Sequence, residues 1–537
     1  MAKNDELLSK QQAEVDNKLW AMADELRGNM DASEFKNYIL GLIFYKFLSD
    51  KIIKTINDEL KDDDLDFYSA WNDESLRKDI EKMSINVLGY FFNPKFFFES
   101  FISKIKKDEF SVEDLKEGIH ALVESTTNTS EKEDETEDEK RAREARAAAF
   151  NDLFDDMDLD DNKLGKGESE RSKLIGKIIL KINDLNLDIN ETNFDILGHA
   201  YEFLIGKFAA SAGKKAGEFY TPAQVSELLA RIVTIENKNI KSVYDPTCGS
   251  GSLLLRVRNN VANPQGLKIY GQEMVTTTYN LARMNMLLHG VDYEKFDIAN
   301  DDTLERPSEK HSHLKFEAVV ANPPYSANWD PDGKDEDSRF NGYAGEYAPK
   351  SKADFAFLQH MIFHLDENGT LAVVLPHGVL FRGASEGQIR RKIVKDYNLI
   401  DAVIGLPANL FFGTAIPTCI LVLKKCRRHS NDVLFIDASS YFEKGKKQNY
   451  LRVEDIERIL DAYKERSSVQ HFSYLATLEE IKNNDYNLNI PRYVKVEEET
   501  VSLDISSTIN DIKELEKKRE ELDLRIEKAL MELKNNE

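Results

Sequence analysis

The residues best suited to chemistry form one short run, Asn322-Pro323-Pro324-Tyr325, at the end of an apolar segment. Residues 316–321 predict a buried strand, which the two prolines end because neither has an N–H to donate. The Asn322 oxygen and the Pro323 carbonyl could accept the two hydrogens of an exocyclic amine, while Tyr325 stacks on its ring. The alternative is a rigid turn without chemistry, since Asn-Pro is ordinary turn sequence.

A second candidate motif, Asp245-Pro246-Thr247-Cys248-Gly249-Ser250-Gly251-Ser252, predicts a strand, a glycine turn and the start of a helix. Gly249 and Gly251 would let the backbone approach a ligand closely, and the helix N-terminus favours a carboxylate or phosphate. The motif lacks the third glycine of a dinucleotide fingerprint and the lysine of a phosphate loop. It therefore argues against NAD and ATP.

Two further motifs lie near the ends of predicted elements. Glu273 ends the next strand, where an acid can accept both hydroxyls of a ribose, although a plain surface acid fits equally well. Upstream, Glu218-Phe219-Tyr220-Thr221-Pro222-Ala223 follows a loop rich in glycine and lysine. It predicts a helix that opens at Pro222 with Thr221 as N-cap, and a capped helix alone would explain these residues.

The elements that must position these motifs alternate between strand and helix. Strands are predicted at residues 242–246, 269–273, 316–321, 370–375, 400–405, 418–424 and 433–437, and helices at 171–185, 194–210, 251–261, 276–289, 353–365 and 386–397. This alternation indicates a doubly wound, mostly parallel α/β sheet. Ligands of such sheets bind beyond the carboxyl ends of the strands, where the candidate motifs fall.

Composition and patterning divide the rest of the chain. We expect a helical N-terminal domain (1–123), an acidic linker and connecting helix (124–169), the α/β domain (170–440), a mixed extension (441–500) and a C-terminal helix (501–537). The acidic block at 131–139 should be disordered or exposed. In the tail, apolar residues recur at two heptad positions, which favours a coiled coil with a partner over a helix returning to its own domain.

Charge and composition limit the possible classes. The 537 residues are 41% hydrophobic and 31% charged, with no apolar run near the roughly 18 residues of a membrane span and no secretory signal. Three cysteines without a CxxC pair predict neither disulfides nor a zinc site, so a cytoplasmic location is expected and no metal is predicted. The net charge of −24 opposes DNA binding by this chain alone.

The joint order of these motifs resembles amino-group DNA methyltransferases that use S-adenosyl-L-methionine, and the Asn-Pro-Pro-Tyr form resembles the adenine-N6 enzymes. Over essentially its whole length the chain resembles the modification (M) subunit of Type I restriction-modification systems. The resemblance implies a Rossmann-like methyltransferase sheet with a helical N-terminal domain and a coiled-coil-like C-terminal helix.

The same resemblance implies site roles and partners. Glu218 to Ala223 and Gly249 to Ser252 would hold the methionine part of the cofactor, Glu273 its ribose, and Asp302 its adenine or the target amine, with Asp301 an equally available neighbour. Phe411 or Phe412 would help to wall the base pocket. The partners implied are double-stranded DNA, a sequence-specificity subunit, a second copy of this chain in a two-to-one complex, and a restriction subunit.

Two rival functions remain open at this point. The same fold could methylate cytosine N4 or a protein glutamine amide, because the motif recognises the geometry of an amine rather than adenine itself. A chain of a different class would bind the cofactor without turnover and serve only in assembly, against which the intact Asn322-Pro323-Pro324-Tyr325 run argues.

Overall fold

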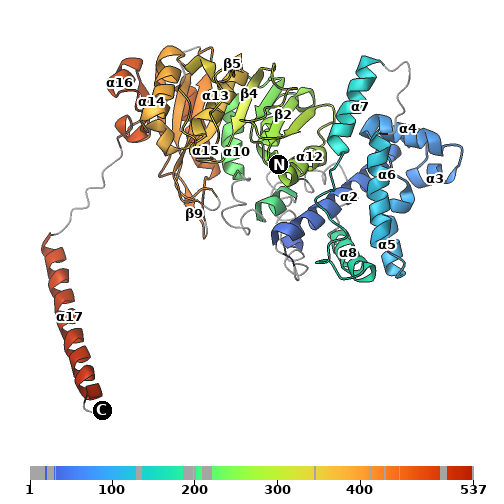
Figure 1. Cartoon of the computed structure of the whole chain (residues 1–537), viewed down its shortest axis with the longest axis horizontal. Coiled ribbons are helices and arrows are strands. Elements are labelled where there is room, and N and C mark those ends of the chain that lie inside the picture. The colour runs from blue at the N-terminus through green and yellow to red at the C-terminus, as the bar shows by residue number, and fades with distance from the viewer. Residues whose placement is uncertain are drawn as a thin grey trace. The chain divides into compact units, whose positions relative to one another are not determined.

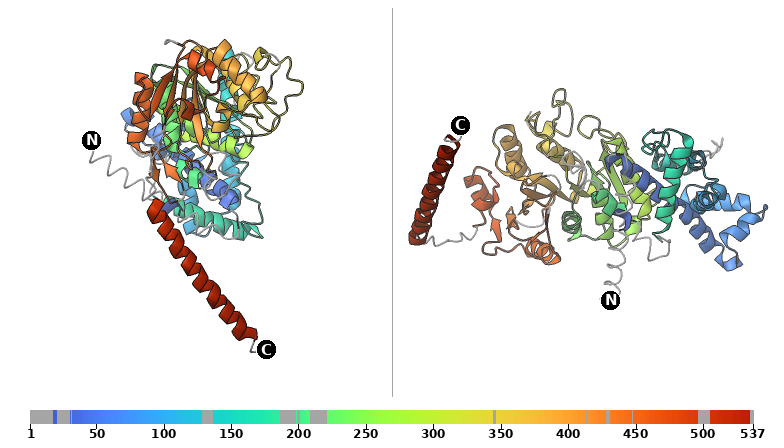
Figure 2. Two further views of the ribbon diagram at one scale, coloured as in Figure 1. Left: turned by 90° about the vertical axis from the view of Figure 1, so that its left-hand side faces the viewer. Right: turned by 90° about the horizontal axis from the view of Figure 1, so that it is seen from below.

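A computed structural model describes residues 18–20, 30, 32–127, 136–185, 198, 201–207, 221–343, 346–411, 414–427, 431–446, 448–495 and 505–534. The chain divides into two compact units, Met1–Val494 and Lys495–Glu537. Within the first unit the N-terminal helices lie beside one end of an α/β sheet (Figures 1 and 2). Among the described helices, none has the length and apolar character needed to cross a membrane.

The N-terminal part is helical, as expected. Its helices are α2 (Ala32–Glu59), α3 (Phe67–Asn72), α4 (Arg77–Leu88), α5 (Phe98–Lys106), α6 (Val112–Thr127), α7 (Glu137–Phe150) and α8 (Glu168–Asn183). α8 packs on α2, α5 and α6, so the helix predicted at 171–185 belongs to this layer and not to the α/β domain expected from residue 170. Its apolar face, which includes Ile175, Ile178 and Ile182, is buried there.

The described part of the acidic block is helical and exposed, which agrees with the expectation that the block would be disordered or exposed. The Thr136 hydroxyl accepts the Glu139 N–H and the Glu139 carboxylate accepts the Thr136 N–H, which together form a capping box that starts α7. The acids from Glu137 to Glu139 lie in the first helical turn, are exposed, and favour a helix N-terminus. Residues 128–135 lie outside the described ranges.

The α/β part is built on a nine-stranded sheet in the order β11-β8-β6-β7-β5-β4-β1-β2-β3. The strands are β1 (Ser242–Asp245), β2 (Lys268–Glu273), β3 (Phe296–Asn300), β4 (Phe316–Ala321), β5 (Leu365–Pro376), β6 (Ile400–Gly405), β7 (Thr418–Lys424), β8 (Val433–Asp437) and β11 (Ser473–Ala476). Only β7 and β11 run antiparallel to their neighbours. The mostly parallel sheet is therefore confirmed.

Helices cover both faces of the sheet. α10 (Ala223–Thr234), α11 (Ser252–Asn259), α12 (Thr276–Leu288) and α15 (Val453–Glu465) share one apolar core with alternate strand residues such as Val243 and Val320. α13 (Asp354–His364), α14 (Ala384–Arg391) and α16 (Leu478–Asn483) pack with the opposite set, which includes Tyr244 and Val319. This alternation follows from the two-residue period of a strand and confirms the doubly wound architecture.

Two edge elements were not predicted. β3 pairs with β2, and β11 pairs with β8, so the sheet continues past the boundary expected at residue 440. Both strands are short, with five and four residues, which leaves little sequence in which a two-residue period can be recognised. A two-stranded hairpin, β9 (Glu443–Lys444) and β10 (Asn449–Tyr450), precedes α15.

The described residues of the second unit include the helix α17 (Ile505–Lys534). Its described apolar side chains are exposed, at 50% for Ile512, 65% for Leu515 and 56% for Leu522. These residues occupy the two heptad positions predicted from the sequence.

Candidate functional site

A cavity of about 260 Å³ opens at the carboxyl ends of the central strands. It lies where the strand order reverses, since β1 has β2 and then β3 on one side and β4 and then β5 on the other. Such a switch point is the usual ligand site of an open α/β sheet. Six predicted residues line the cavity, namely Thr221, Gly249, Glu273, Asp302, Asn322 and Pro324.

The glycine turn after β1 forms part of the cavity floor. Gly249 and Gly251 have φ angles of 54° and 76°, in the left-handed region that glycine tolerates. A Cβ on Gly251 would lie 2.6 Å from the methyl carbon of Met286 on α12. Gly251 therefore permits helix packing rather than ligand approach, which corrects its predicted role. Gly249, by contrast, does line the cavity.

Two buried carboxyls lie beneath this turn. Glu273 accepts the N–H groups of Gly249 at 3.0 Å and Val275 at 2.9 Å, and burial raises its pKa. Asp245 does not line the cavity but accepts the Thr247 N–H at 2.9 Å. Burial, and to a lesser degree the nearby Glu273 carboxylate, raises the pKa of Asp245 to about 7. A cationic ligand would favour the ionised form of both groups.

Asp302, not Asp301, faces the cavity. The Asp302 carboxylate accepts the N–H groups of Leu304 and Glu305, at 2.8 and 3.2 Å, which shapes the loop after β3. Asp301 is instead paired with the exposed Arg306 at 2.6 Å. Of the two neighbours that the sequence left open, Asp302 is the one that lines the cavity.

The Asn322 amide is held from both sides. Its Nδ2 donates to the Thr221 hydroxyl at 3.1 Å, and its Oδ1 accepts the Tyr325 hydroxyl at 2.6 Å. Thr221 is therefore not the N-cap of the following helix. α10 begins at Ala223 with Pro222 at the cap position and no side-chain capping bond. A residue predicted to cap a helix instead orients the amide at the tip of β4.

The aromatic part of the motif lies beside a second ring. Tyr325 and Phe411 approach edge to face, with ring centroids 6.0 Å apart. Neither residue lines the cavity described above, and nor do Pro222, Ala223, Asp245, Ser250, Gly251, Ser252 and Pro323. The predicted residues Glu218, Phe219, Tyr220 and Phe412 lie outside the described ranges.

Apolar lining residues that were not predicted include Met274, Trp329 and Phe357. Met274 directly follows Glu273 and is 62% exposed, while Trp329 and Phe357 are buried walls. Met274 could have been predicted from the sequence, because it directly follows Glu273, the acid at the end of a strand. Trp329, in the segment after β4, and Phe357, on α13, reach the cavity only through the tertiary fold. Acidic groups, a glycine turn and apolar walls together suit a nucleoside-like ligand with a cationic group.

Comparisons with known proteins agree with this geometry. Residues 192–501 match the N-6 DNA Methylase family model, and residues 15–182 match the HsdM N-terminal domain model. The chain is 38% identical over 534 residues to the Type I restriction enzyme MpnII methylase subunit of Mycoplasma pneumoniae, covering 97% of this chain and 96% of that one. It is 33% identical to the HindI methylase subunit of Haemophilus influenzae, covering 66% of this chain and 84% of that one.

A solved structure shares the fold over most of the chain. The Type I restriction-modification methyltransferase subunit from Streptococcus thermophilus superposes with a TM-score of 0.81 at 41% identity, covering 90% of this chain and 100% of that one. With both family models matched and near-complete coverage of the relatives, the chain belongs to the methylase (modification) subunits of Type I restriction enzymes, which are adenine-N6 DNA methyltransferases.

Proposed function

We propose that this chain transfers a methyl group from S-adenosyl-L-methionine to N6 of an adenine in a DNA site chosen by a separate specificity subunit. The observation that carries the proposal is the Asn322 amide, which lines the cavity at the tip of β4 between Thr221 and Tyr325. The family of the chain supports the same reaction.

The residues present fit the cofactor. Gly249 leaves its backbone open to the cavity, and the N-terminus of α11 favours the cofactor carboxylate. Glu273 and Asp302 would accept the ribose and adenine donors, while Met274 and Phe357 would cover the apolar ring faces. When bound, the cofactor supplies an electrophilic methyl group on a positively charged sulfur, and the two buried carboxyls favour that charge.

The chain's own contribution to the reaction is orientation. The adenine must leave the duplex to reach the cavity, and the Tyr325 ring would stack on it. Asn322 Oδ1 and the Pro323 carbonyl would then accept the two hydrogens of its amine. These bonds direct the nitrogen lone pair towards the methyl group, and the nitrogen later loses one proton to water.

Several basic residues form hydrogen bonds and ion pairs within the fold, which supports the proposal that this chain needs a partner subunit to bind DNA. Arg390 donates to the carbonyls of Tyr486 and Val379, and Lys424 pairs with Glu236 and Asp401. Arg427 donates to Asn398. Arg390, Lys424 and Arg427 are therefore occupied inside the fold, in a chain of net charge −24, whereas DNA affinity depends on phosphate neutralisation by Lys and Arg.

The exposed apolar seam of α17 supports assembly through this helix. We infer a coiled coil with the specificity subunit in a complex that contains two copies of this chain and can take up a restriction subunit. A structural relative with the same fold, at a TM-score of 0.60 and 19% identity, comes from work on complex assembly of a type I restriction-modification system.

The test is methyl incorporation by the reconstituted complex with wild type, Asn322→Ala and the control Asn368→Ala, an exposed residue near the start of β5. Asn322→Ala should lose at least about 90% of the rate and keep cofactor affinity within a few-fold, because Asn322 faces the target amine. Retention of more than a tenth of the rate would reject this role. Incorporation into protein or cytosine instead of adenine would reject the proposed substrate.

A further inference from the structure

Two separate segments form opposing walls of the cofactor cavity. One follows β3 and supplies Asp302, Thr303 and Leu304, and the other follows the Asn322 motif and supplies residues 327–329. Neither segment belongs to a helix or strand, so the sheet alone does not fix the distance between them. Some other contact must hold both walls in place.

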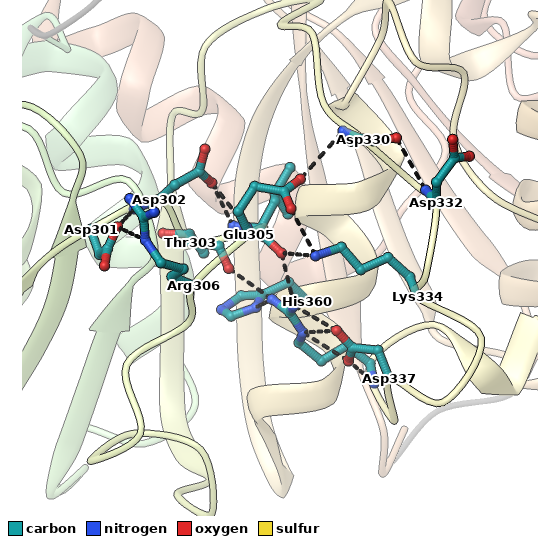
Figure 3. A network of polar contacts seen from close by, with 12 residues as sticks. Asp301, Asp302, Thr303, Glu305, Arg306, Asp330, Asp332, Lys334, Asp337 and His360 are labelled. Atoms are coloured by element: carbon teal, nitrogen blue, oxygen red, sulfur yellow. Dashed lines mark hydrogen bonds and ion pairs between the residues drawn. The ribbon is translucent and has the colours of Figure 1, made fainter.

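Arg339 is buried, with 5% of its surface exposed, and bonds to the first wall, while its neighbour Phe340 packs against Trp329 of the second wall with ring centroids 5.4 Å apart. Its Nη1 donates to the Thr303 carbonyl at 2.7 Å, and its Nη2 donates to the Leu304 carbonyl at 2.9 Å. Asp337 accepts bonds from Nε and Nη2 of the same guanidinium, at 3.0 and 2.6 Å. Figure 3 shows Thr303, Asp337 and His360 converging on this point.

The contact extends to the central strand through His360 on α13. Arg339 Nη1 lies 3.0 Å from His360 Nδ1, and because a guanidinium only donates, this nitrogen must accept. The ring proton is then on Nε2, which donates to the Tyr244 hydroxyl at 2.9 Å. Burial keeps the pKa of His360 well below its usual range, so the ring is neutral. Tyr244 directly precedes Asp245 at the end of β1.

A second, more exposed connection joins the same segments. Lys334 donates to the Leu304 carbonyl at 3.2 Å and pairs with Glu305 at 2.9 Å, and Glu305 also accepts the Asp330 N–H (Figure 3). Glu305 is 37% exposed in its side chain, so solvent screens part of this ion pair. The buried guanidinium, which satisfies two backbone carbonyls and a carboxylate at once, therefore dominates the attachment.

We propose that Arg339 is a positioning residue of the S-adenosyl-L-methionine site, which sets the separation of the two cavity walls without touching the cofactor. The inference rests on the proposed function for the identity of the ligand. Arg339→Ala should raise the Kd for S-adenosyl-L-methionine about ten-fold or more, since two carbonyls lose a charged donor. Arg339→Lys keeps the positive charge but not the forked geometry of the guanidinium, so its Kd should lie between those of the wild type and Arg339→Ala.

The rate at saturating cofactor should change much less than the Kd, because Arg339 contacts neither the Asn322 amide nor Tyr325. A general loss of folding would lower both. Arg306→Ala is the matched control, since Arg306 is 74% exposed in its side chain and pairs only with Asp301 in the same loop. This control should bind the cofactor like the wild type.

The experiment is calorimetric titration of the full-length chain with S-adenosyl-L-methionine, paired with Trp329 fluorescence in a Trp20→Phe, Trp71→Phe background. Trp329 lines the cavity, so its emission should change on binding in the wild type and need more cofactor to change in Arg339→Ala. If Arg339→Ala does not fold, Arg339→Lys and Asp337→Asn carry the same comparison.

The outcomes separate the two proposals. A wild type that binds no S-adenosyl-L-methionine would overturn the proposed function. A wild type that binds it, with folded Arg339 variants of unchanged affinity, would overturn only the role of Arg339. A raised Kd in Arg339→Ala, partial recovery in Arg339→Lys and no change in Arg306→Ala would support it.

Discussion

Replacing Tyr325 by phenylalanine tests how the catalytic motif meets its substrate. The Tyr325 hydroxyl donates to Asn322 Oδ1 at 2.6 Å, the atom that we propose accepts a hydrogen of the target amine. Substrate binding must therefore displace a hydrogen bond that the free protein already makes. Tyr325→Phe removes this competitor and keeps the ring that would stack on the base.

The size of the effect follows from the strength of that bond. A neutral hydrogen bond contributes a net of about 0.5–1.5 kcal/mol, so Tyr325→Phe should raise kcat/KM for DNA about 2- to 10-fold. Stacking of a base on an aromatic side chain contributes about 1–3 kcal/mol, so Tyr325→Ala should lower kcat/KM about 5- to 150-fold. The two variants therefore change the rate in opposite directions.

The assay is methyl transfer by the complex with its specificity subunit on a duplex of its recognition sequence. A duplex with 2-aminopurine in place of the target adenine serves as control for binding, since this base stacks but has no amine at C6. Tyr325→Phe should tighten binding of the adenine duplex only. If Tyr325→Phe were ten-fold slower than the wild type, the hydroxyl would assist the reaction. That result would refute the proposal that the hydroxyl competes with the target amine for Asn322 Oδ1.

Three further predictions concern other parts of the chain. The Asp354 carboxylate accepts hydrogen bonds from the Ser326 N–H and the Arg382 guanidinium, both at 2.8 Å. Asp354→Ala should therefore release the turn after Tyr325 and lower kcat about ten-fold, measured by kinetics, while calorimetry should show an unchanged cofactor affinity. Between about pH 4 and 7 folded Asp245 holds a proton that the unfolded chain has lost, so the free protein loses stability as the pH rises. Asp245→Asn should flatten this pH dependence and raise the free energy of unfolding at pH 8 by about 2–4 kcal/mol, measured by denaturant unfolding. Deleting residues 505–537 should leave the first unit folded but abolish co-purification with the specificity subunit, and normal stoichiometry would contradict the role of α17.

The parts of the site that the sequence predicted are those fixed by local backbone restrictions. Pro323 and Pro324 must end β4, and the left-handed turn at Gly249 needs glycine wherever the rest of the chain lies. The alternating pattern of the central strands likewise predicted the sheet. These inferences needed no knowledge of which segments become neighbours.

The inferences that failed depended on tertiary partners. Gly251 follows the same local rule as Gly249, but its close neighbour is Met286 on α12 rather than a ligand. Thr221 has the sequence context of an N-cap, yet its hydroxyl pairs with an amide about a hundred residues away. Arg390 is buried and donates to two backbone carbonyls, a role that its sequence context does not reveal.

The buried carboxyls near the cavity lower the stability of the free protein. Burial raises the pKa values of Asp245 and Glu273, and the Glu273 carboxylate adds to the rise at Asp245, so ionising either carboxyl is unfavourable there. A neutral apolar floor would fold more favourably but would offer nothing to a cationic ligand. Because a bound positive charge lowers both pKa values, cofactor binding below about pH 7 should release protons. Calorimetry in buffers of different ionisation enthalpy would detect this release, and an affinity that does not increase with pH from 5 to 7 would mean that these carboxyls do not sense the cofactor.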